Sequence, residues 1–120
     1  MQVALVKTFR FEAAHWLPTF PEGHKCRRMH GHSFIVDVEV SGPVDPEKGY
    51  LVDYGEIAAA WAPLMCDLDH HLLNEVEGLE NPTSEVLAAW IWGRLQPTLP
   101  LLSSVTVHET CTSTCRYCGS

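Results

Sequence analysis

The 120-residue sequence predicts an α+β fold in which an antiparallel sheet carries two helices packed on one face. Three observations predict it: two runs of alternating apolar and polar residues near the N-terminus, two capped helical runs in the middle, and a further alternating run near the C-terminus. Strands with polar outer faces favour an antiparallel sheet that is covered on one side. We expect residues 1–120 to form a single domain, because this length suits one hydrophobic core.

The first two strands are expected at residues 2–13 and at about residues 32–41, where apolar and polar residues alternate. Between them, residues 16–29 contain two prolines and one glycine and have no steady period. This segment is therefore expected to form a loop. The apolar face of the first strand is made by Val3, Leu5, Phe9 and Phe11.

Two helices are expected next. Asp53 and Glu56 resemble a capping box that opens a helix reaching Leu68, and Pro63 should kink that helix or divide it in two. Asn81-Pro82 is expected to supply the cap and the first-turn proline of a second helix at residues 83–95. Because this second helix is apolar on most sides, it must be covered by the sheet, by the first helix or by another subunit.

The C-terminal part is expected to form a third strand in which Val105, Val107 and Glu109 share one face. A carboxylate thus lies in line with two buried valines, and such a group must be paired or must bind something. A ligand with two parallel N–H donors, such as an aminopyrimidinone ring, would suit it, and an internal ion pair with Arg or Lys is the alternative. The short tail 111–120 leaves room for one final edge strand.

The charge and cysteine content limit the classes of partner. The formal net charge is -7, which argues against a nucleic-acid surface, and the chain has no apolar run long enough to cross a bilayer and no leader segment. We therefore expect no nucleic-acid partner, no membrane partner and a cytoplasmic location. The five cysteines are an odd number and are expected to be thiols or ligands in a reducing compartment.

Three histidines form a candidate metal site. His30 and His32 are separated by Gly31 and point to one side of a strand, and His15 ends the first alternating run. Three neutral nitrogen ligands without a fourth protein ligand indicate catalytic zinc, which keeps one position open. The spacing also suits copper or nickel, and a single histidine on an apolar face is more often satisfied by a hydrogen bond.

Cys26 lies just before the histidine pair, among the basic residues Lys25, Arg27 and Arg28. Neighbouring cations or a metal lower the pKa of a thiol, which makes it useful as a base or nucleophile. The same cations could bind a polyanionic ligand. A buried structural cysteine and a solvated basic cluster are the alternatives.

Two further groups of residues have candidate roles. Asp69-His70 could form a carboxylate–imidazole relay, although a histidine at a helix C-terminus can equally serve as a cation that the helix dipole favours. The tail has C-x3-C-x2-C spacing, which is typical of iron–sulfur enzymes of the radical S-adenosylmethionine type. Those enzymes need a large barrel after the motif, so we expect thiols here, with a cluster or second metal as the lesser alternative. The cysteines concerned are Cys111, Cys115 and Cys118.

Five motifs, taken in order along nearly the whole chain, resemble those of the 6-pyruvoyl-tetrahydropterin synthase superfamily. The gap between Cys26 and His30 and the ending Glu109-Thr110-Cys111-Thr112 are similar to its bacterial branch, which makes 6-carboxy-5,6,7,8-tetrahydropterin in the queuosine (7-deazaguanine) pathway. The motifs are Phe11-Glu12-Ala13-Ala14-His15, Cys26 with His30-Gly31-His32, Leu68-Asp69-His70, Asn81-Pro82-Thr83-Ser84-Glu85 and Val107-His108-Glu109-Thr110.

This resemblance implies the tunnelling fold, in which the sheets of three subunits join into a barrel and two trimers stack into a hexamer. It implies Zn2+ as the cofactor and a pterin triphosphate as the substrate. 7,8-Dihydroneopterin triphosphate would be converted into 6-carboxytetrahydropterin, acetaldehyde and triphosphate. The nearest rival is 6-pyruvoyl-tetrahydropterin synthase activity on the same substrate, and a rival of another class is a non-catalytic zinc-stabilised module.

The resemblance also implies a role for each candidate residue. The zinc ligands would be His15, His30 and His32. Cys26 would be the proton acceptor, and Asp69 with His70 would be a charge relay that comes from a different subunit than the cysteine. Glu109, followed by Thr110, would anchor the pterin ring, and Glu109 is also a candidate catalytic member of the relay. Lys25, Arg27 or Arg28 would meet the triphosphate.

Overall fold

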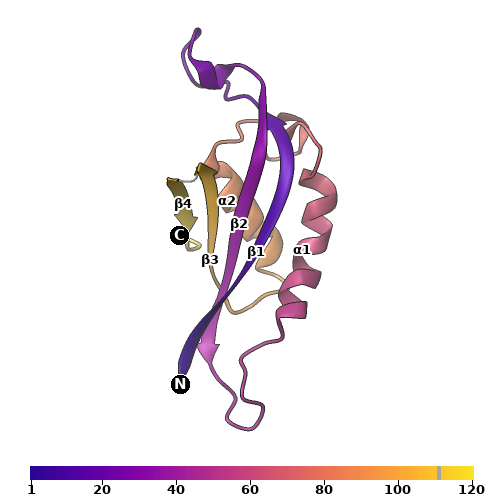
Figure 1. Cartoon of the computed structure of the whole chain (residues 1–120), viewed down its shortest axis with the longest axis vertical. Coiled ribbons are helices and arrows are strands. Elements are labelled where there is room, and N and C mark those ends of the chain that lie inside the picture. Colours follow the sequence, from indigo (N-terminus) through magenta and orange to yellow (C-terminus); the bar gives the residue numbers. More distant parts are fainter. Residues whose placement is uncertain (111) are drawn as a thin grey trace.

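The computed structural model describes residues 1–110 and 112–120. Its sheet has the strand order β1-β2-β3-β4, and every neighbouring pair is antiparallel. Both helices cover the same face of this sheet (Figure 1), which confirms the predicted α+β fold. The elements are β1 (Gln2–His15), η1 (Lys25–Arg27), β2 (His30–Pro43), α1 (Tyr54–Leu68), η2 (Leu73–Glu75), α2 (Ser84–Leu95), β3 (Leu102–Thr110) and β4 (Ser113–Tyr117).

The first two strands are longer than the sequence pattern predicts. Their pairing runs through Ala13 opposite His32 to His15 opposite His30, so all three candidate metal ligands lie on paired strands. Backbone hydrogen bonding between the strands continues two residues past the predicted strand bounds at residues 13 and 32. The loop is correspondingly confined to residues 16–29, between two fixed strand ends.

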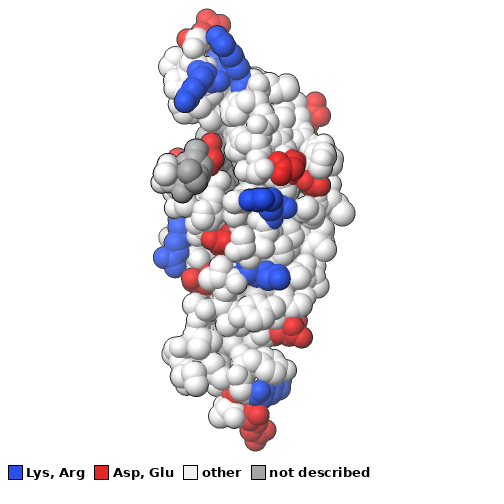
Figure 2. Space-filling view, viewed as in Figure 1, with Lys and Arg blue, Asp and Glu red and all other residues white. Residues whose placement is uncertain are grey.

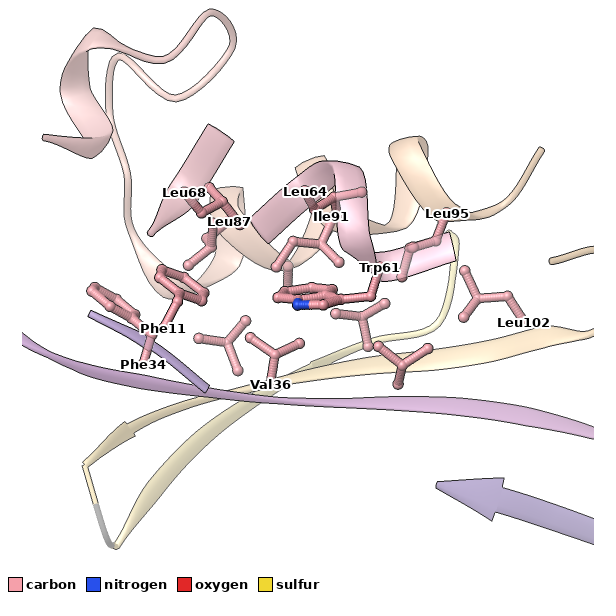
Figure 3. Close-up of a cluster of buried hydrophobic side chains, with 14 of the residues drawn as sticks. Phe11, Phe34, Val36, Trp61, Leu64, Leu68, Leu87, Ile91, Leu95 and Leu102 are labelled. Carbon is pink, nitrogen blue, oxygen red and sulfur yellow. The ribbon is translucent and has the colours of Figure 1, made fainter. Parts of the chain in front are cut away.

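The core lies between the sheet and the helices (Figure 3). Phe11 of β1 stacks on Phe34 of β2 with ring centroids 5.0 Å apart, and Phe9 stacks on Trp61 of α1 at 4.7 Å. The apolar face of β2 is at most 1% exposed, as its alternation predicts. Burying these side chains stabilises the fold at the end of the sheet where the histidines lie.

Helix α1 begins as predicted but is not divided. Asp53 is its N-cap, and its Oδ1 accepts a hydrogen bond from the Gly55 N–H at 2.8 Å. Pro63 lies within one continuous helix, on its exposed side, so the expectation of a division was wrong. The reason is tertiary: Trp61 and Leu64, on either side of the proline, are both buried in the core, which outweighs one lost backbone hydrogen bond.

The expected cap of the second helix was wrong by two residues. Thr83 is the N-cap of α2, because its side chain accepts a hydrogen bond from the Val86 N–H at 3.1 Å. Asn81 and Pro82 precede the helix, and Pro82 is buried. Beyond α2, the tail adds β4 at the sheet edge, as predicted. Within the described residues, neither helix has the length and apolar character that crossing a bilayer requires.

The open face of the sheet carries a polar network around Asp37. Its two carboxylate oxygens contact Thr8 Oγ1 at 2.6 Å and His108 Nε2 at 2.8 Å. Desolvation is the largest single influence on the pKa of Asp37 and raises it, but the hydrogen bonds from Thr8 and His108 and the charge of His108 together outweigh it. The pKa of Asp37 is therefore lowered from 3.8, its ordinary value.

Asp37→Asn should destabilise the protein at pH 7 by about 1 kcal/mol and have less effect in acid. A carboxylate whose pKa is lowered on folding stabilises the folded state fully above its unfolded pKa, and this contribution is lost as the pH falls through the folded value. Urea unfolding of both proteins at pH 7 and at about pH 3 measures the difference. Glu22→Gln, an exposed residue of the loop, is the control. A difference in unfolding free energy between Asp37→Asn and the wild type that is the same at both pH values would contradict the prediction.

Candidate metal centre and catalytic cavity

The structure brings the three predicted metal ligands together at the end of β1 and β2. His15 Nε2 lies 3.1 Å from His30 Nε2 and 3.1 Å from His32 Nε2. His15 is 1% exposed, whereas the other two side chains are half-buried. The three nitrogens therefore converge on one point that is closed on the core side and open toward solvent.

The second ring nitrogen of each histidine faces a backbone carbonyl oxygen. The Nδ1 atom of His15 lies 3.1 Å from the Pro82 oxygen, and that of His30 lies 2.8 Å from the Arg28 oxygen. The Nδ1 atom of His32 lies 3.4 Å from the Ser33 oxygen. A carbonyl can only accept, so each Nδ1 carries the proton and donates it, which leaves the lone pair of Nε2 directed at the shared point.

The three ligand nitrogens lie within 4.8 Å of one another, and lone pairs this close repel one another unless a cation lies between them, so the donor set fits a metal ion. Among the described residues, no further His, Cys, Asp or Glu completes the group. Three protein ligands and an open position are the arrangement of a catalytic metal site.

The protonation of His15 also favours metal binding. Burial is the main reason that the pKa of His15 is lowered from its ordinary value of 6.5. The hydrogen bond to Pro82 opposes this effect, while the neighbouring His30 and His32 lower the pKa further. The neutral imidazole, which is the form that binds metal, is therefore the stable form of His15 at neutral pH.

Cys26 and Glu109 share a cavity of about 600 Å³ with the metal site. Cys26 belongs to the 3-10 turn η1 and is half-buried, so it is not the fully buried structural cysteine of the alternative interpretation. Residues 26 and 109 are distant in sequence, yet both line this cavity. The cavity is lined by Lys25, Cys26, His30, His32, Ser33 and Glu109.

The beginning of helix α2 positions both the metal site and the carboxylate. The Ser84 hydroxyl donates a short hydrogen bond to Glu109 Oε2, and two residues earlier the Pro82 carbonyl orients His15. The partner of Glu109 within the chain is thus a hydroxyl and not the Arg or Lys of the alternative interpretation. Sequence reasoning missed these roles of Ser84 and Pro82, because their contacts join segments that are 25 and 67 residues apart.

Asp69 and His70 form the predicted hydrogen-bonded pair, with His70 Nδ1 2.9 Å from Asp69 Oδ2. Asp69 Oδ1 accepts the Glu12 N–H at 2.9 Å, and the His70 N–H donates to the Glu12 carbonyl at 2.6 Å. These contacts hold the pair against β1, with His70 in a left-handed conformation at φ 59°. The hydrogen bond from Glu12, followed by that from His70, lowers the pKa of Asp69, which keeps it ionised.

Within one chain, this pair does not face the thiol. His70 lines a second cavity together with Glu12, Gly31 and His32, and Cys26 is not part of that lining. The imidazole is 79% exposed and is therefore free to contact a group outside its own chain.

The basic residues of the loop differ in what they contact. Lys25 lines the cavity beside Cys26, whereas Arg27 directs Nη1 to two carbonyl oxygens of its own loop. Figure 2 shows Lys and Arg side chains gathered at the end of the molecule that loop 16–29 forms. The predicted contribution of the Thr110 side chain lies outside what the structure describes.

The cysteine motif of the tail is only partly visible, because Cys111 lies outside the described residues. Cys115 and Cys118 are free thiols. Burial, followed by the charge of Glu85, raises the pKa of Cys115, so this thiol is less prone to ionise.

The α+β fold places three histidines that could hold a metal ion beside a thiol and a carboxylate. This arrangement is typical of a metal-dependent enzyme. The family model for 6-pyruvoyl tetrahydropterin synthase matches residues 4–120. The chain belongs to this 6-pyruvoyl tetrahydropterin synthase family.

Individual relatives agree with the family match. The chain is 48% identical to a 6-carboxy-5,6,7,8-tetrahydropterin synthase of Synechocystis, over 94% of this chain and 91% of that protein. It is 31% identical to a dihydroneopterin monophosphate aldolase of Pyrococcus furiosus, over 83% of this chain and 81% of that one. The solved 6-pyruvoyl tetrahydropterin synthase of Caenorhabditis elegans superposes with a TM-score of 0.91 at 26% identity, covering 100% of this chain and 97% of that one. The architecture is therefore that of the tunnelling fold.

Proposed function

We propose that this chain is a zinc-dependent lyase that converts 7,8-dihydroneopterin triphosphate into 6-carboxy-5,6,7,8-tetrahydropterin, acetaldehyde and triphosphate. The observation that carries the proposal is the shared cavity in which two of the three convergent histidines meet Cys26 and Glu109. The 48% identity to a synthase of that name, over nearly the whole chain, supports the choice of reaction. We place the enzyme in the cytoplasm and in the queuosine pathway, as one tunnelling-fold domain spanning residues 1–120.

His15, His30 and His32 would hold the zinc ion. Three neutral imidazoles and an open position match the ligand set of catalytic zinc sites. When bound, zinc would polarise substrate oxygen atoms and lower the pKa of a bound hydroxyl group. The carbonyl partners of the three Nδ1 atoms keep the rings in place for that ion.

Cys26 would accept the proton from the substrate side chain. It lines the cavity with His30, His32 and Lys25. Glu109 would anchor the pterin ring, because a carboxylate can accept two parallel N–H donors of an aminopyrimidinone. The adjoining Thr110 would assist. Thiol and carboxylate thus act on the reacting and the recognised end of one ligand.

The Asp69–His70 pair would move protons in the cavity of a neighbouring subunit. Asp69 holds the proton on His70 Nδ1, which leaves Nε2 free to accept one. Because His70 and Cys26 line different cavities within one chain, we infer that an assembly brings the two groups together. We infer a homohexamer made of two stacked trimers, in which the sheets of three chains close into a barrel.

The triphosphate would be met by Lys25, which lines the cavity, with Arg28 as the next exposed cation. Arg27 is less well placed, since its guanidinium is engaged within the loop. A chain with a net charge of -7 needs such a local basic patch to attract a polyanion.

The direct test is to incubate the metal-loaded protein with dihydroneopterin triphosphate and to identify the products by mass spectrometry. We expect 6-carboxytetrahydropterin and one acetaldehyde per turnover. A 6-pyruvoyl product without acetaldehyde would assign the rival synthase activity. Turnover of the monophosphate alone would favour an activity like that named for the Pyrococcus relative. If neither substrate is turned over, the result would favour the alternative of a non-catalytic, zinc-stabilised module.

Ser84→Ala should raise the KM for the pterin substrate about 5-fold, because Glu109 loses the hydroxyl that fixes one of its oxygens, worth about 1 kcal/mol. Metal content should not change. Steady-state kinetics and metal analysis measure both. Ser103→Ala is a matched control, because it removes a similar serine–glutamate hydrogen bond, to Glu39 at 2.7 Å, outside the cavity. Equal effects of the two variants would contradict the assigned role.

A further inference from the structure

We propose that Arg27 is a positioning residue that holds Cys26 at the edge of the cavity, an inference that rests on the catalytic role proposed for Cys26. The loop at residues 16–29 extends beyond the end of the sheet (Figure 1), and the turn η1 is its only regular element among the described residues. The Arg27 guanidinium crosses the loop: Nη1 donates to the carbonyl oxygens of Pro18 at 2.6 Å and of Phe20 at 2.9 Å. One charged group therefore joins two limbs of the loop: the outgoing limb, which contains Pro18 and Phe20, and the returning limb, which carries Cys26 and Arg27.

The backbone of Cys26 is held from both sides by the same limbs. Its N–H donates to His24 Nδ1 at 3.0 Å, and its carbonyl oxygen accepts the N–H of Leu17 at 2.9 Å. Leu17 is buried and fixes the outgoing limb to the core. The two carbonyls that Arg27 contacts follow Leu17 within three residues, so Arg27 holds the limb on which the Cys26 carbonyl depends.

The chemistry of arginine suits this role better than charge alone would. Both bonds come from one nitrogen, Nη1, whose two N–H groups diverge within the rigid plane of the guanidinium and form the fork that holds the two carbonyls. Hydrogen bonds from a charged donor are about twice as strong as neutral ones. An ammonium group is a point charge on a flexible stem and reproduces the fork poorly. The neighbouring Arg28 is exposed, and its side chain makes no hydrogen bond or ion pair within the described part of the chain. It therefore serves as a matched control for the loss of one positive charge.

Without the fork, the limbs of the loop separate more often and the thiol spends less time at the cavity. Small displacements of a reacting group lower the rate steeply, whereas binding through Glu109 and the metal site is unaffected. The inference thus predicts a loss in kcat with little change in KM. It also predicts faster hydrogen exchange at residues 17–27, where the affected amides lie.

The test compares Arg27→Met, Arg27→Lys and Arg28→Met in the metal-loaded full chain, by hydrogen–deuterium exchange and by steady-state kinetics on dihydroneopterin triphosphate. Arg27→Met should speed exchange of residues 17–27 about 10-fold and lower kcat about 10- to 100-fold, with KM within about 3-fold. Arg27→Lys should remain defective in both, and Arg28→Met should leave exchange within about 2-fold of the wild type. Should Arg27→Met fail to fold, Arg27→Lys carries the test.

Two results would overturn the inference. Exchange and kcat at wild-type values in both Arg27 variants would show that the fork does not hold the loop. Wild-type exchange at residues 17–27 in Arg27→Lys, with faster exchange there in Arg28→Met, would show that only the positive charge matters. If the wild-type protein does not turn over the substrate, the proposed function fails, while the exchange measurement still decides whether Arg27 holds the loop.

Discussion

Replacing Cys26 with alanine will give a folded, metal-loaded protein whose turnover is lower by about 10³-fold, the usual contribution of a positioned general base. The thiol lines the cavity beside His30 and His32, but it is not one of the three candidate metal ligands. Metal content and the unfolding midpoint should therefore stay at wild-type values. Metal analysis, circular dichroism and a product assay on the same sample measure the three quantities.

Cys66→Ala is the control, because Cys66 is an exposed, free thiol on α1, on the helical side of the sheet. Its activity should equal that of the wild type. A Cys26→Ala variant that retains full activity would remove the thiol from the mechanism. If the Cys26→Ala variant instead contains no metal, Cys26 is a metal ligand.

Replacing His32 with alanine will remove both the metal and the activity. One of three convergent nitrogens is lost, so the affinity for zinc should fall by more than the roughly 10- to 100-fold that is typical of losing an outer-shell partner. Turnover should then fall below detection. Competition with a chromophoric chelator measures the affinity, and the acetaldehyde assay measures the turnover.

His71→Ala is the matched control for this prediction. His71 is exposed and lies outside the histidine group, with Nδ1 2.8 Å from the Asp69 carbonyl oxygen. The His71→Ala variant should bind zinc as tightly as the wild-type protein does. Equal zinc loss in both variants would contradict a three-histidine site and would point to nonspecific binding by surface imidazoles.

The elements of the fold follow from local patterns in the sequence, and their ends do not. The alternation of β2 and the cap at Asp53 predict a strand and a helix because each depends on neighbouring residues. Tertiary contacts decide the rest. Burial on both sides of Pro63 keeps α1 in one piece, and strand pairing extends β1 and β2 to the histidines.

The candidate site shows the same division. Parity along two strands places His30 and His32 together and brings His15 near them, so the metal site could be predicted from spacing. Contacts between distant segments could not be predicted in this way, and the hydrogen bond from the Ser84 hydroxyl to Glu109 is an example. Charge alone assigned Arg27 to the substrate, because nothing in the sequence indicates that its guanidinium turns back on two carbonyls of its own loop.

Zinc K-edge X-ray absorption of the purified protein tests the central claim most directly, because it reports the ligand atoms around the metal. We predict one zinc ion per chain, bound by three imidazole nitrogens at about 2.0–2.1 Å and by one further light atom at the open position. A sulfur ligand at about 2.3 Å would contradict this account, because it would place the metal on the cysteines rather than on the three histidines.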